Sequence, residues 1–197
     1  ILVGYLGSLE AVKAAGEIID RLLAPGGVAI VDPAMADNGK LYSGFDEDYV
    51  RAIGSLARKA DIILPNVTEA AILSDLPYQE NIDKNYVNQL LNGLNHPCAV
   101  LTGVDFDEDS TGIVLQEGTV QHEYRHKRIG NGCHGTGDIF AAVFTGALMQ
   151  GKNRLDAAKI AADFTCRCIK NTVNAPAHWY GVKFEPLLPE LMEMPGR

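Results

Sequence analysis

Short apolar runs alternate with amphipathic stretches along most of the chain. Uninterrupted apolar runs, which are typical of buried strands, occupy residues 28–31, 62–64 and 99–101. Apolar residues at helical spacing predict helices over residues 9–23, 46–56, 68–73, 86–94, 136–144, 155–170 and 186–192. Residues 111–116 and 119–125 flank Glu117-Gly118 and indicate a β-hairpin. The alternation of strand and helix therefore predicts an α/β fold, with a mostly parallel central sheet and helices on both faces.

A polar residue follows each of the three predicted buried strands. Asp32, Asn66 and Thr102 occupy these positions. In open parallel sheets, ligands bind beyond the carboxyl ends of the strands. We therefore expect these three side chains to converge on one crevice with the helix start at Thr136.

The most informative stretch is Gly135-Thr136-Gly137-Asp138, a glycine-rich turn that runs into an apolar helix. Free backbone N–H groups at a helix start attract anions, and small residues let a phosphate approach closely. Asp138 in the first turn would accept a proton from an attacking hydroxyl. The stretch thus offers the anion cradle and the base that phosphoryl transfer to an alcohol needs. The alternative is a tight turn in which Asp138 only favours the helix dipole.

Two of the strand ends suit both a local structural role and a role in binding. The spacing of Asn66 and Glu69 is typical of a helix cap with a capping box. Alternatively, these two residues organise phosphate-bound Mg²⁺, largely through water. Asp32 and Asp37 either form an aspartate turn or place two carboxylates near a nucleotide–Mg²⁺ complex. The flexible Asn38-Gly39 pair that follows suits a flap over nucleotide.

Familiar nucleotide motifs do not account for this chain. Residues 130–135 match the letters G-x-G-x-x-G, but the segment before them is polar and helices follow them, so a dinucleotide site is not expected. The P-loop string G-x-x-x-x-G-K-[ST] does not occur. Thr102-Gly103 either forms a loop or offers a hydroxyl and open backbone to nucleotide phosphates. We interpret Cys133 and His134, beside the glycine turn, as structural or surface residues.

Composition and charge narrow the function classes. Apolar residues make up 47% and charged residues 21% of the chain, which is ordinary for a globular protein. A net charge of −8 without a dense Lys/Arg cluster argues against a nucleic-acid partner. No apolar run is long enough to cross a bilayer. The four cysteines lack zinc-site spacing, so we expect reduced thiols in a reducing cytoplasm.

Three ordered segments carry a resemblance to a known family. They are 32–42, with Asp32-Pro33 and Asp37-Asn38-Gly39-Lys40-Leu41-Tyr42, then 61–70, with Asn66-Val67-Thr68-Glu69, and then 135–138. Together they resemble the ribokinase superfamily. With the opening Gly4-Tyr5-Leu6-Gly7-Ser8, the chain is most similar to its pyridoxal (pyridoxine, pyridoxamine) kinase branch. The resemblance covers nearly the whole chain and implies one ribokinase-like kinase domain over residues 1–197, a Rossmann-like three-layer sandwich.

The resemblance implies ATP-dependent phosphorylation of the hydroxymethyl group of a vitamin B6 compound. In that family, the residue matching Asp138 is the general base, and those matching Gly135, Thr136 and Gly137 form an anion hole for the moving phosphoryl group. The family's N-x-x-E motif, which organises Mg²⁺ and phosphates, matches Asn66 and Glu69. The remaining matches on the ATP and metal side are Asp32, Asp37, Thr102 and Gly103. Magnesium, often with potassium, a cytoplasmic location and a homodimer are further implications.

Three departures from the family pattern define the alternatives. Ala36 stands where the family has glycine, which restricts the backbone of the nucleotide flap. Hydroxymethylpyrimidine kinases carry cysteine at the position of Asp138, which argues against a pyrimidine substrate. The chain opens at Ile1 inside a strand-like run, so we expect the family's first strands to be absent. The competing hypotheses are another kinase of the superfamily, acting on hydroxymethylpyrimidine or a sugar, and an inactive nucleotide-binding homologue or fragment.

Overall fold

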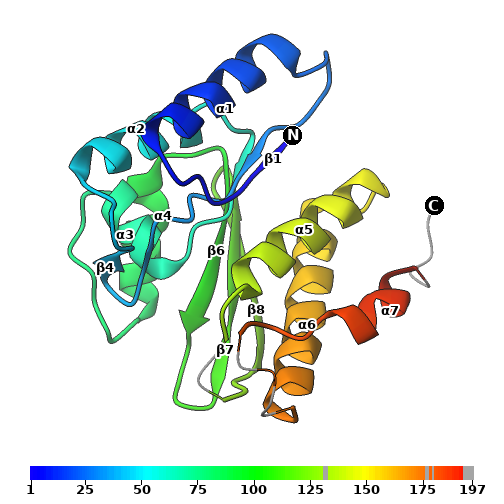
Figure 1. The fold of residues 1–197 in the computed structure, drawn as a ribbon. Helices are drawn as coiled ribbons and strands as arrows, with labels where there is room; N and C mark the ends of the chain where they lie inside the picture. Colours follow the sequence, from blue (N-terminus) through cyan, green and yellow to red (C-terminus); the bar gives the residue numbers. More distant parts are fainter. Residues whose placement is uncertain (131–132, 176–177, 179, 193–197) are drawn as a thin grey trace.

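A six-stranded sheet forms the centre of the molecule (Figure 1). The computed structural model describes residues 1–130, 133–175, 178 and 180–192. In spatial order the strands are β1 (Leu2–Val3), β2 (Ile30–Val31), β5 (Ile62–Ile63), β6 (Cys98–Asp105), β7 (Ser110–Glu117) and β8 (Val120–Lys127). The first four are parallel, and β7 and β8 continue the sheet antiparallel. The predicted mostly parallel sheet and the hairpin around Glu117-Gly118 are confirmed.

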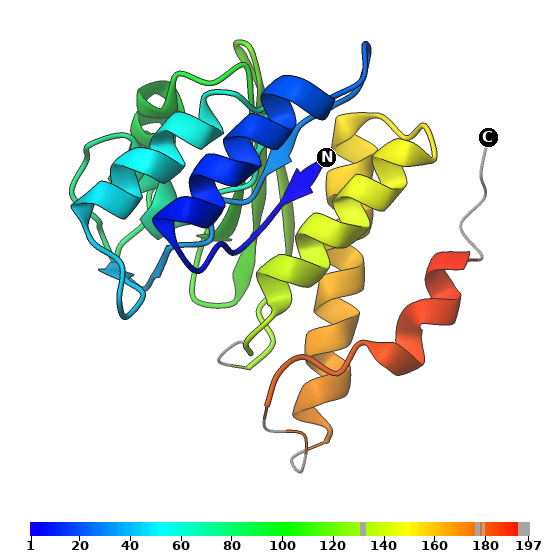
Figure 2. The same cartoon turned by 45° about the horizontal axis from the view of Figure 1, so that its top comes forward.

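Helices cover both faces of this sheet, as the sequence predicts. Successive strand residues point to opposite faces, so Val31 and Leu101 join one buried apolar cluster, and Ile30 and Val100 join the other. The first face packs against α1 (Leu9–Leu22), α2 (Glu47–Ala57), α3 (Val67–Leu73) and α4 (Lys84–Leu94). The second packs against α5 (Thr136–Met149) and α6 (Arg154–Val173). Figure 2 shows α1 and α2 on one side of the strands and α5 and α6 on the other.

The last described part of the chain follows α6. It contains a short 3₁₀ helix, η1 (Glu185–Leu187), and α7 (Leu188–Met192), which together correspond to the predicted terminal helix. Leu187 and Leu191 of these helices, and Phe184 just before them, are partly buried against the cluster that α5 and α6 form with the sheet. None of the described helices combines the length and apolar character that crossing a membrane requires.

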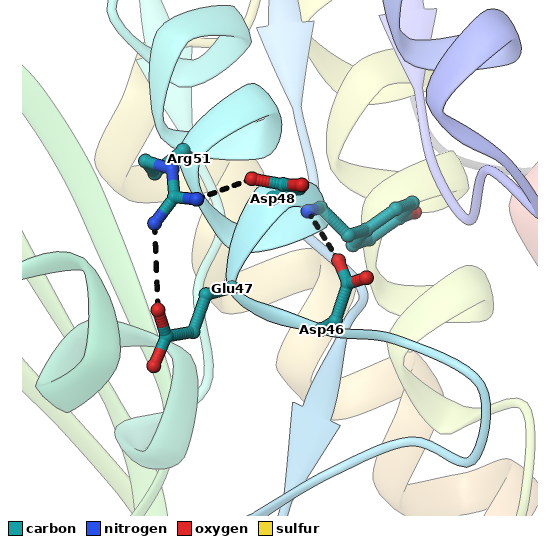
Figure 3. A network of polar contacts seen from close by, with 5 residues as sticks. Asp46, Glu47, Asp48 and Arg51 are labelled. Carbon is teal, nitrogen blue, oxygen red and sulfur yellow. Dashed lines mark hydrogen bonds and ion pairs between the residues drawn. The ribbon is translucent and has the colours of Figure 1, made fainter.

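Side-chain caps explain where several helices begin. The capping residues are Ser8, Asp46, Asn66, Asp83 and Asn153. At the start of α2, the backbone N–H of Tyr49 donates to Asp46 Oδ1 at 2.9 Å, and Arg51 pairs with Glu47 and Asp48 one turn on (Figure 3). These ion pairs are exposed, so they add little to stability. The caps predicted at Ser8, Asp46 and Asn66 are confirmed.

The segment expected as a flexible loop after Asp32 is a small hairpin. β3 (Ala36–Asp37) and β4 (Lys40–Leu41) pair antiparallel around Asn38-Gly39. Both turn residues have positive φ, 50° and 74°, which suits the Asn-Gly pair in a two-residue hairpin turn. The Gly39 N–H also donates to Thr68 Oγ1 at 3.0 Å. The hairpin is therefore tied to α3, a contact that its own sequence does not reveal.

Two glycine substitutions test how the sheet and α5 are packed. A β-carbon on Gly112 in β7 would lie 2.0 Å from the Tyr124 carbonyl oxygen of β8. We expect Gly112→Ala to lower the free energy of unfolding by roughly 1–3 kcal/mol, because the two strands must separate.

The matched control is Gly146→Ala on the exposed side of α5, where an added β-carbon meets no atom within 4 Å. It should raise the free energy of unfolding by roughly 0.5–1 kcal/mol, the usual gain for alanine over glycine in a helix. Urea denaturation measures both changes. Equal stability of the two variants would contradict the strand pairing.

Candidate functional site

A cleft of about 460 Å³ lies at the carboxyl ends of the parallel strands and at the start of α5. The structure brings to it all ten residues that the sequence singled out. They are Asp32, Asp37, Asn66, Glu69, Thr102, Gly103, Gly135, Thr136, Gly137 and Asp138. The residues come from the end of β2, the β3–β4 hairpin, the start of α3, the middle of β6 and the start of α5, so only the sheet topology makes them neighbours.

Glu69 joins two of these strand ends. Its carboxylate, 2% exposed, accepts N–H bonds from Asn66 at 2.8 Å, Met35 at 3.0 Å and Ala36 at 3.4 Å. Asn66 completes a capping box by accepting the Glu69 N–H at 2.9 Å, and it donates to the Ala36 carbonyl at 2.8 Å. The capping-box role is therefore confirmed. It also fixes the loop after β2 against the start of α3.

Asp32 and Asp138 bring two carboxylates to the same cleft. Asp32, at the end of β2, is 8% exposed, and its pKa is raised to about 7 by burial and by the charge of Asp138. A β-carbon on Gly137 would lie 3.8 Å from Asp32 Oδ2. The glycine turn thus passes directly beside this strand end. Burial and then the charge of Asp32 likewise raise the pKa of Glu69 to about 8, against the effect of its three N–H donors.

The glycine turn leaves the start of α5 open. Gly135 occupies the N-cap position with a left-handed φ of 84°, and among the described residues no side chain caps this helix. The first N–H groups of a helix have no partner within it. Those of Thr136, Gly137 and Asp138 are therefore available to an anion in the cleft.

The β6 strand bulges where it meets the cleft. Its register against β7 shifts between Thr102 and Val104, and the intervening Gly103 has a φ of 64°. The prediction that this strand ends at Thr102 is wrong, because β6 continues to Asp105 after the bulge. The Thr102 hydroxyl donates to the Pro65 carbonyl at 3.4 Å, which aligns this part of β6 with the chain after β5. The open backbone at Gly103 and the Thr102 hydroxyl remain beside the cleft.

The hairpin of β3 and β4 forms another wall. Asp37 accepts two hydrogen bonds at 2.9 Å from Asn38, so its carboxylate is held at the hairpin turn. Ala36 was expected to restrict this backbone. In the structure Ala36 has negative φ, is fully buried and lies in β3, so the alanine fits the conformation that the segment adopts.

Several residues of the cleft were not singled out as functional by the sequence. Tyr5 lies two residues after the end of β1, one position beyond the place that Asp32 occupies after β2. Cys133 and His134, interpreted as structural or surface residues, also border the cleft. Cys166 of α6 contacts His126 of β8, with 2.8 Å between Sγ and Nδ1. No local signal reveals that pair, because it depends on how α6 packs on the hairpin.

The remaining sequence expectations at this site concern cysteines and residues outside the described ranges. The four cysteines are free thiols. Cys168 is buried in the core while Cys166 faces the cleft, as their two-residue spacing on a helix indicates. Asn131 and Gly132, within the G-x-G-x-x-G letters, lie outside the described residues.

The donor set fits a magnesium ion that keeps much of its water. Within the described ranges, no three His, Cys, Asp or Glu side chains are grouped to hold a metal ion, and no hydrogen bond reaches the Asp32 carboxylate. The side-chain oxygens of Asn66 and Glu69 already accept backbone N–H groups. Mg²⁺ is usually bound through one or two carboxylates together with waters and substrate phosphates. Asp32 would suit direct ligation, and the other two would act through water.

Comparison with known proteins identifies related chains. A family model described as phosphomethylpyrimidine kinase matches residues 1–182. A hydroxymethylpyrimidine/phosphomethylpyrimidine kinase of Haemophilus influenzae is 25% identical over 87% of this chain. The chain spans 65% of that relative's length, which is less than two thirds.

Solved structures share the whole architecture. A putative phosphomethylpyrimidine kinase from Bacteroides thetaiotaomicron, crystallised with pyridoxal, has a TM-score of 0.90 and 29% identity, over 100% of this chain and 72% of that one. A pyridoxal kinase from Lactobacillus plantarum has a TM-score of 0.84 and 31% identity, over 97% of this chain and 69% of that one. Both support the ribokinase-like fold that the sequence predicts.

The raised pKa of Asp32 gives a stability prediction. Its folded pKa of about 7 exceeds the ordinary 3.8, so the folded state binds this proton more tightly than the unfolded state does. The free energy of unfolding of the wild type should therefore fall as the pH rises from about 4 to about 7.

Asp32→Asn removes the contribution of Asp32 to this dependence. We expect the variant to be more stable than the wild type at pH 8, by more than about 1 kcal/mol, and the difference to shrink towards pH 5. Urea denaturation at several pH values measures it, with the exposed cleft residue Asp37→Asn as the control. If the difference in unfolding free energy between Asp32→Asn and the wild type does not change with pH, the raised pKa of Asp32 is contradicted.

Proposed function

This chain belongs to the phosphomethylpyrimidine kinase family, and we propose that it transfers the γ-phosphoryl group of ATP to the hydroxymethyl group of a vitamin B6 compound. The observation that supports the proposal best is the meeting of Asp138, an uncapped helix start and the buried Asp32 in one cleft. An anion cradle beside a base is what transfer to an alcohol requires.

In the proposed reaction, Asp138 accepts the proton of the substrate's primary hydroxyl. The hydroxyl oxygen forms a bond to the γ-phosphorus, while the bond from that phosphorus to the β–γ bridging oxygen breaks and ADP leaves. The N–H groups of Thr136 and Gly137 donate to the oxygens of the transferring group. Donors that are already oriented stabilise such charge without reorganising during the reaction. No phosphorylated enzyme intermediate is needed.

The nucleotide would lie along the strand ends. Thr102, Gly103 and Asp37 would face it, and Asp32, Asn66 and Glu69 would hold its magnesium ion. When bound, Mg²⁺ neutralises phosphate charge. The family resemblance adds three points to this proposal: a potassium ion, a homodimer and a cytoplasmic location.

Two observations favour a vitamin B6 compound over a pyrimidine. The resemblance gives hydroxymethylpyrimidine kinases a cysteine where this chain has Asp138. The Lactobacillus plantarum pyridoxal kinase matches nearly the whole chain, and so does the Bacteroides thetaiotaomicron protein, which is described as a putative phosphomethylpyrimidine kinase but was crystallised with pyridoxal. The Haemophilus influenzae relative keeps hydroxymethylpyrimidine as the second candidate.

Asp138→Asn tests the base. The amide cannot take up the proton, so we expect kcat of the complete protein to fall by roughly 10²–10⁴-fold, while ATP still binds. Asp48→Asn, on the exposed face of α2, serves as the control and should keep wild-type turnover. Unchanged turnover in Asp138→Asn would remove this residue from the mechanism.

A panel of acceptors tests the substrate class. A coupled assay for ADP release, run with pyridoxal, hydroxymethylpyrimidine and ribose, should give the highest kcat/KM for pyridoxal. A higher kcat/KM for hydroxymethylpyrimidine or ribose would change the proposed substrate but not the proposed phosphoryl transfer. ATP binding without turnover on any acceptor would support an inactive nucleotide-binding homologue instead.

A further inference from the structure

The segment 181–183 packs against the glycine turn. The Val182 N–H donates to the His134 carbonyl oxygen at 2.9 Å. A β-carbon on Gly135 would lie 3.5 Å from Val182 Cγ1, so this side chain covers the turn directly. Val182 is 7% exposed and belongs to the same buried cluster as Phe140 of α5. The segment therefore contacts the residues that immediately precede the open helix start.

Two side chains at the end of α6 hold this segment from the other side. The Thr172 hydroxyl accepts the Lys183 N–H at 2.7 Å, and Asn171 Nδ2 donates to the Lys183 carbonyl at 2.9 Å. Thr172 itself is 9% exposed, and its hydroxyl donates to the Cys168 carbonyl at 2.7 Å, which fixes its orientation. Both polar groups of the Lys183 backbone are thus bound to neighbouring residues of one helix.

Thr172 also lies beside the start of the turn. Burial raises the pKa of the Cys133 thiol, and a hydrogen bond with the Thr172 side chain opposes that rise. The hydroxyl therefore lies near residue 133 on one side and bonds to residue 183 on the other. His134 and Gly135 follow residue 133 in the chain and contact Val182, the neighbour of Lys183.

The glycine turn needs such support from outside. Gly135 has a left-handed φ, and glycine loses more conformational freedom on ordering than any other residue. A side-chain cap would fix the turn, but in the described part of the chain α5 has none. The direction of the first N–H groups of α5 must then be set by contacts with the backbone before them.

We propose that Thr172 and Asn171 are positioning residues for the glycine turn. Through Lys183 and Val182 they hold the His134 carbonyl, and with it the N–H groups that start α5. The catalytic consequence rests on the function proposed above, because it assumes that these N–H groups bind the transferring phosphoryl group. Neither residue lines the cleft.

Thr172→Val is the main test, since it keeps the shape of the side chain and removes its hydroxyl. A small displacement of the turn should lower kcat by roughly 10- to 100-fold, with the KM values for ATP and acceptor unchanged. Thr172→Ser, which restores the hydroxyl, should recover most of kcat. A variant that is only less stable would contain fewer folded molecules. We therefore calculate kcat per ATP-binding site, measured by titration with ATP, and not per total protein.

Thr145→Val is the matched control. The Thr145 hydroxyl also donates to a carbonyl four residues earlier in its helix, that of Ala141 at 2.8 Å. It has no bond to the glycine turn or to segment 181–183. Its kcat and KM should equal those of the wild type. Equal kcat in the two valine variants would overturn the proposal.

Amide hydrogen exchange provides a readout that does not depend on activity. The amides of Val182 and Ile139 donate to the His134 and Gly135 carbonyls. In Thr172→Val both should exchange faster than in the wild type, while amides in α1 keep their rates. Unchanged exchange at both sites would overturn the positioning role even if the protein proves to have no kinase activity. If these amides exchange faster in Thr172→Val but the wild type has no kinase activity, only the proposed function is overturned.

If Thr172→Val does not fold, Asn171→Ala carries the same test. It removes only the bond to the Lys183 carbonyl on a partly exposed side chain. The expected result is the same pattern with a smaller fall in kcat and faster exchange at Val182. Wild-type values for both would overturn the proposal.

Discussion

The buried carboxylate of Glu69 is the interaction on which the arrangement of the cleft depends. It accepts N–H groups from the loop after β2 and from the end of β5, so one side chain joins two strand ends. Burial and the charge of Asp32 raise the pKa of Glu69 to about 8, and its three N–H donors act against this rise. A polar group in the interior is unfavourable unless hydrogen bonds satisfy it. The loop must therefore adopt the conformation that supplies these donors. Asp32 and the β3–β4 hairpin follow from that conformation.

Charge in the cleft is unbalanced in a way that favours a metal-bound nucleotide. Asp32 and Glu69 both have raised pKa values, and the charges of Asp138 and Asp32 contribute to these shifts. A free triphosphate would add negative charge to the same space. The helix start at Gly135 supplies only a partial positive charge. A divalent cation beside Asp32 would relieve both the repulsion among the carboxylates and that with the phosphates.

The sequence predicted most of the site because its residues occupy positions with a general physical meaning. A polar residue after a short apolar run identified Asp32, Asn66 and Thr102, although β6 continues past Thr102, and the glycine turn identified Asp138. The capping box at Asn66 and Glu69 follows from local spacing alone. These rules concern residues near each other in the chain, or strand ends that every parallel sheet brings together.

What the sequence did not predict depends on contacts between distant segments. The hairpin at 36–41 is held by Glu69 and Thr68 of α3, and its own composition indicates only a turn. The contact of Cys166 with His126 depends on the packing of α6 against β8. The same is true of segment 181–183, whose composition gives no sign that it covers Gly135. The sequence pattern predicts the helices and strands. These contacts depend instead on how the helices and strands pack against one another.

The open start of α5 shows why such distant contacts matter for chemistry. A side-chain cap would stabilise the helix by about 1 kcal/mol, but it would occupy N–H groups that an anion needs. A turn without a cap keeps these groups free and loses the local interaction that would hold them in place. The order of the turn must then come from its neighbours, Asp32 beside Gly137 on the cleft side and Val182 over Gly135 on the other. A binding surface made of backbone is thus as rigid as the side chains packed around it, and those side chains lie outside every motif that marks the site.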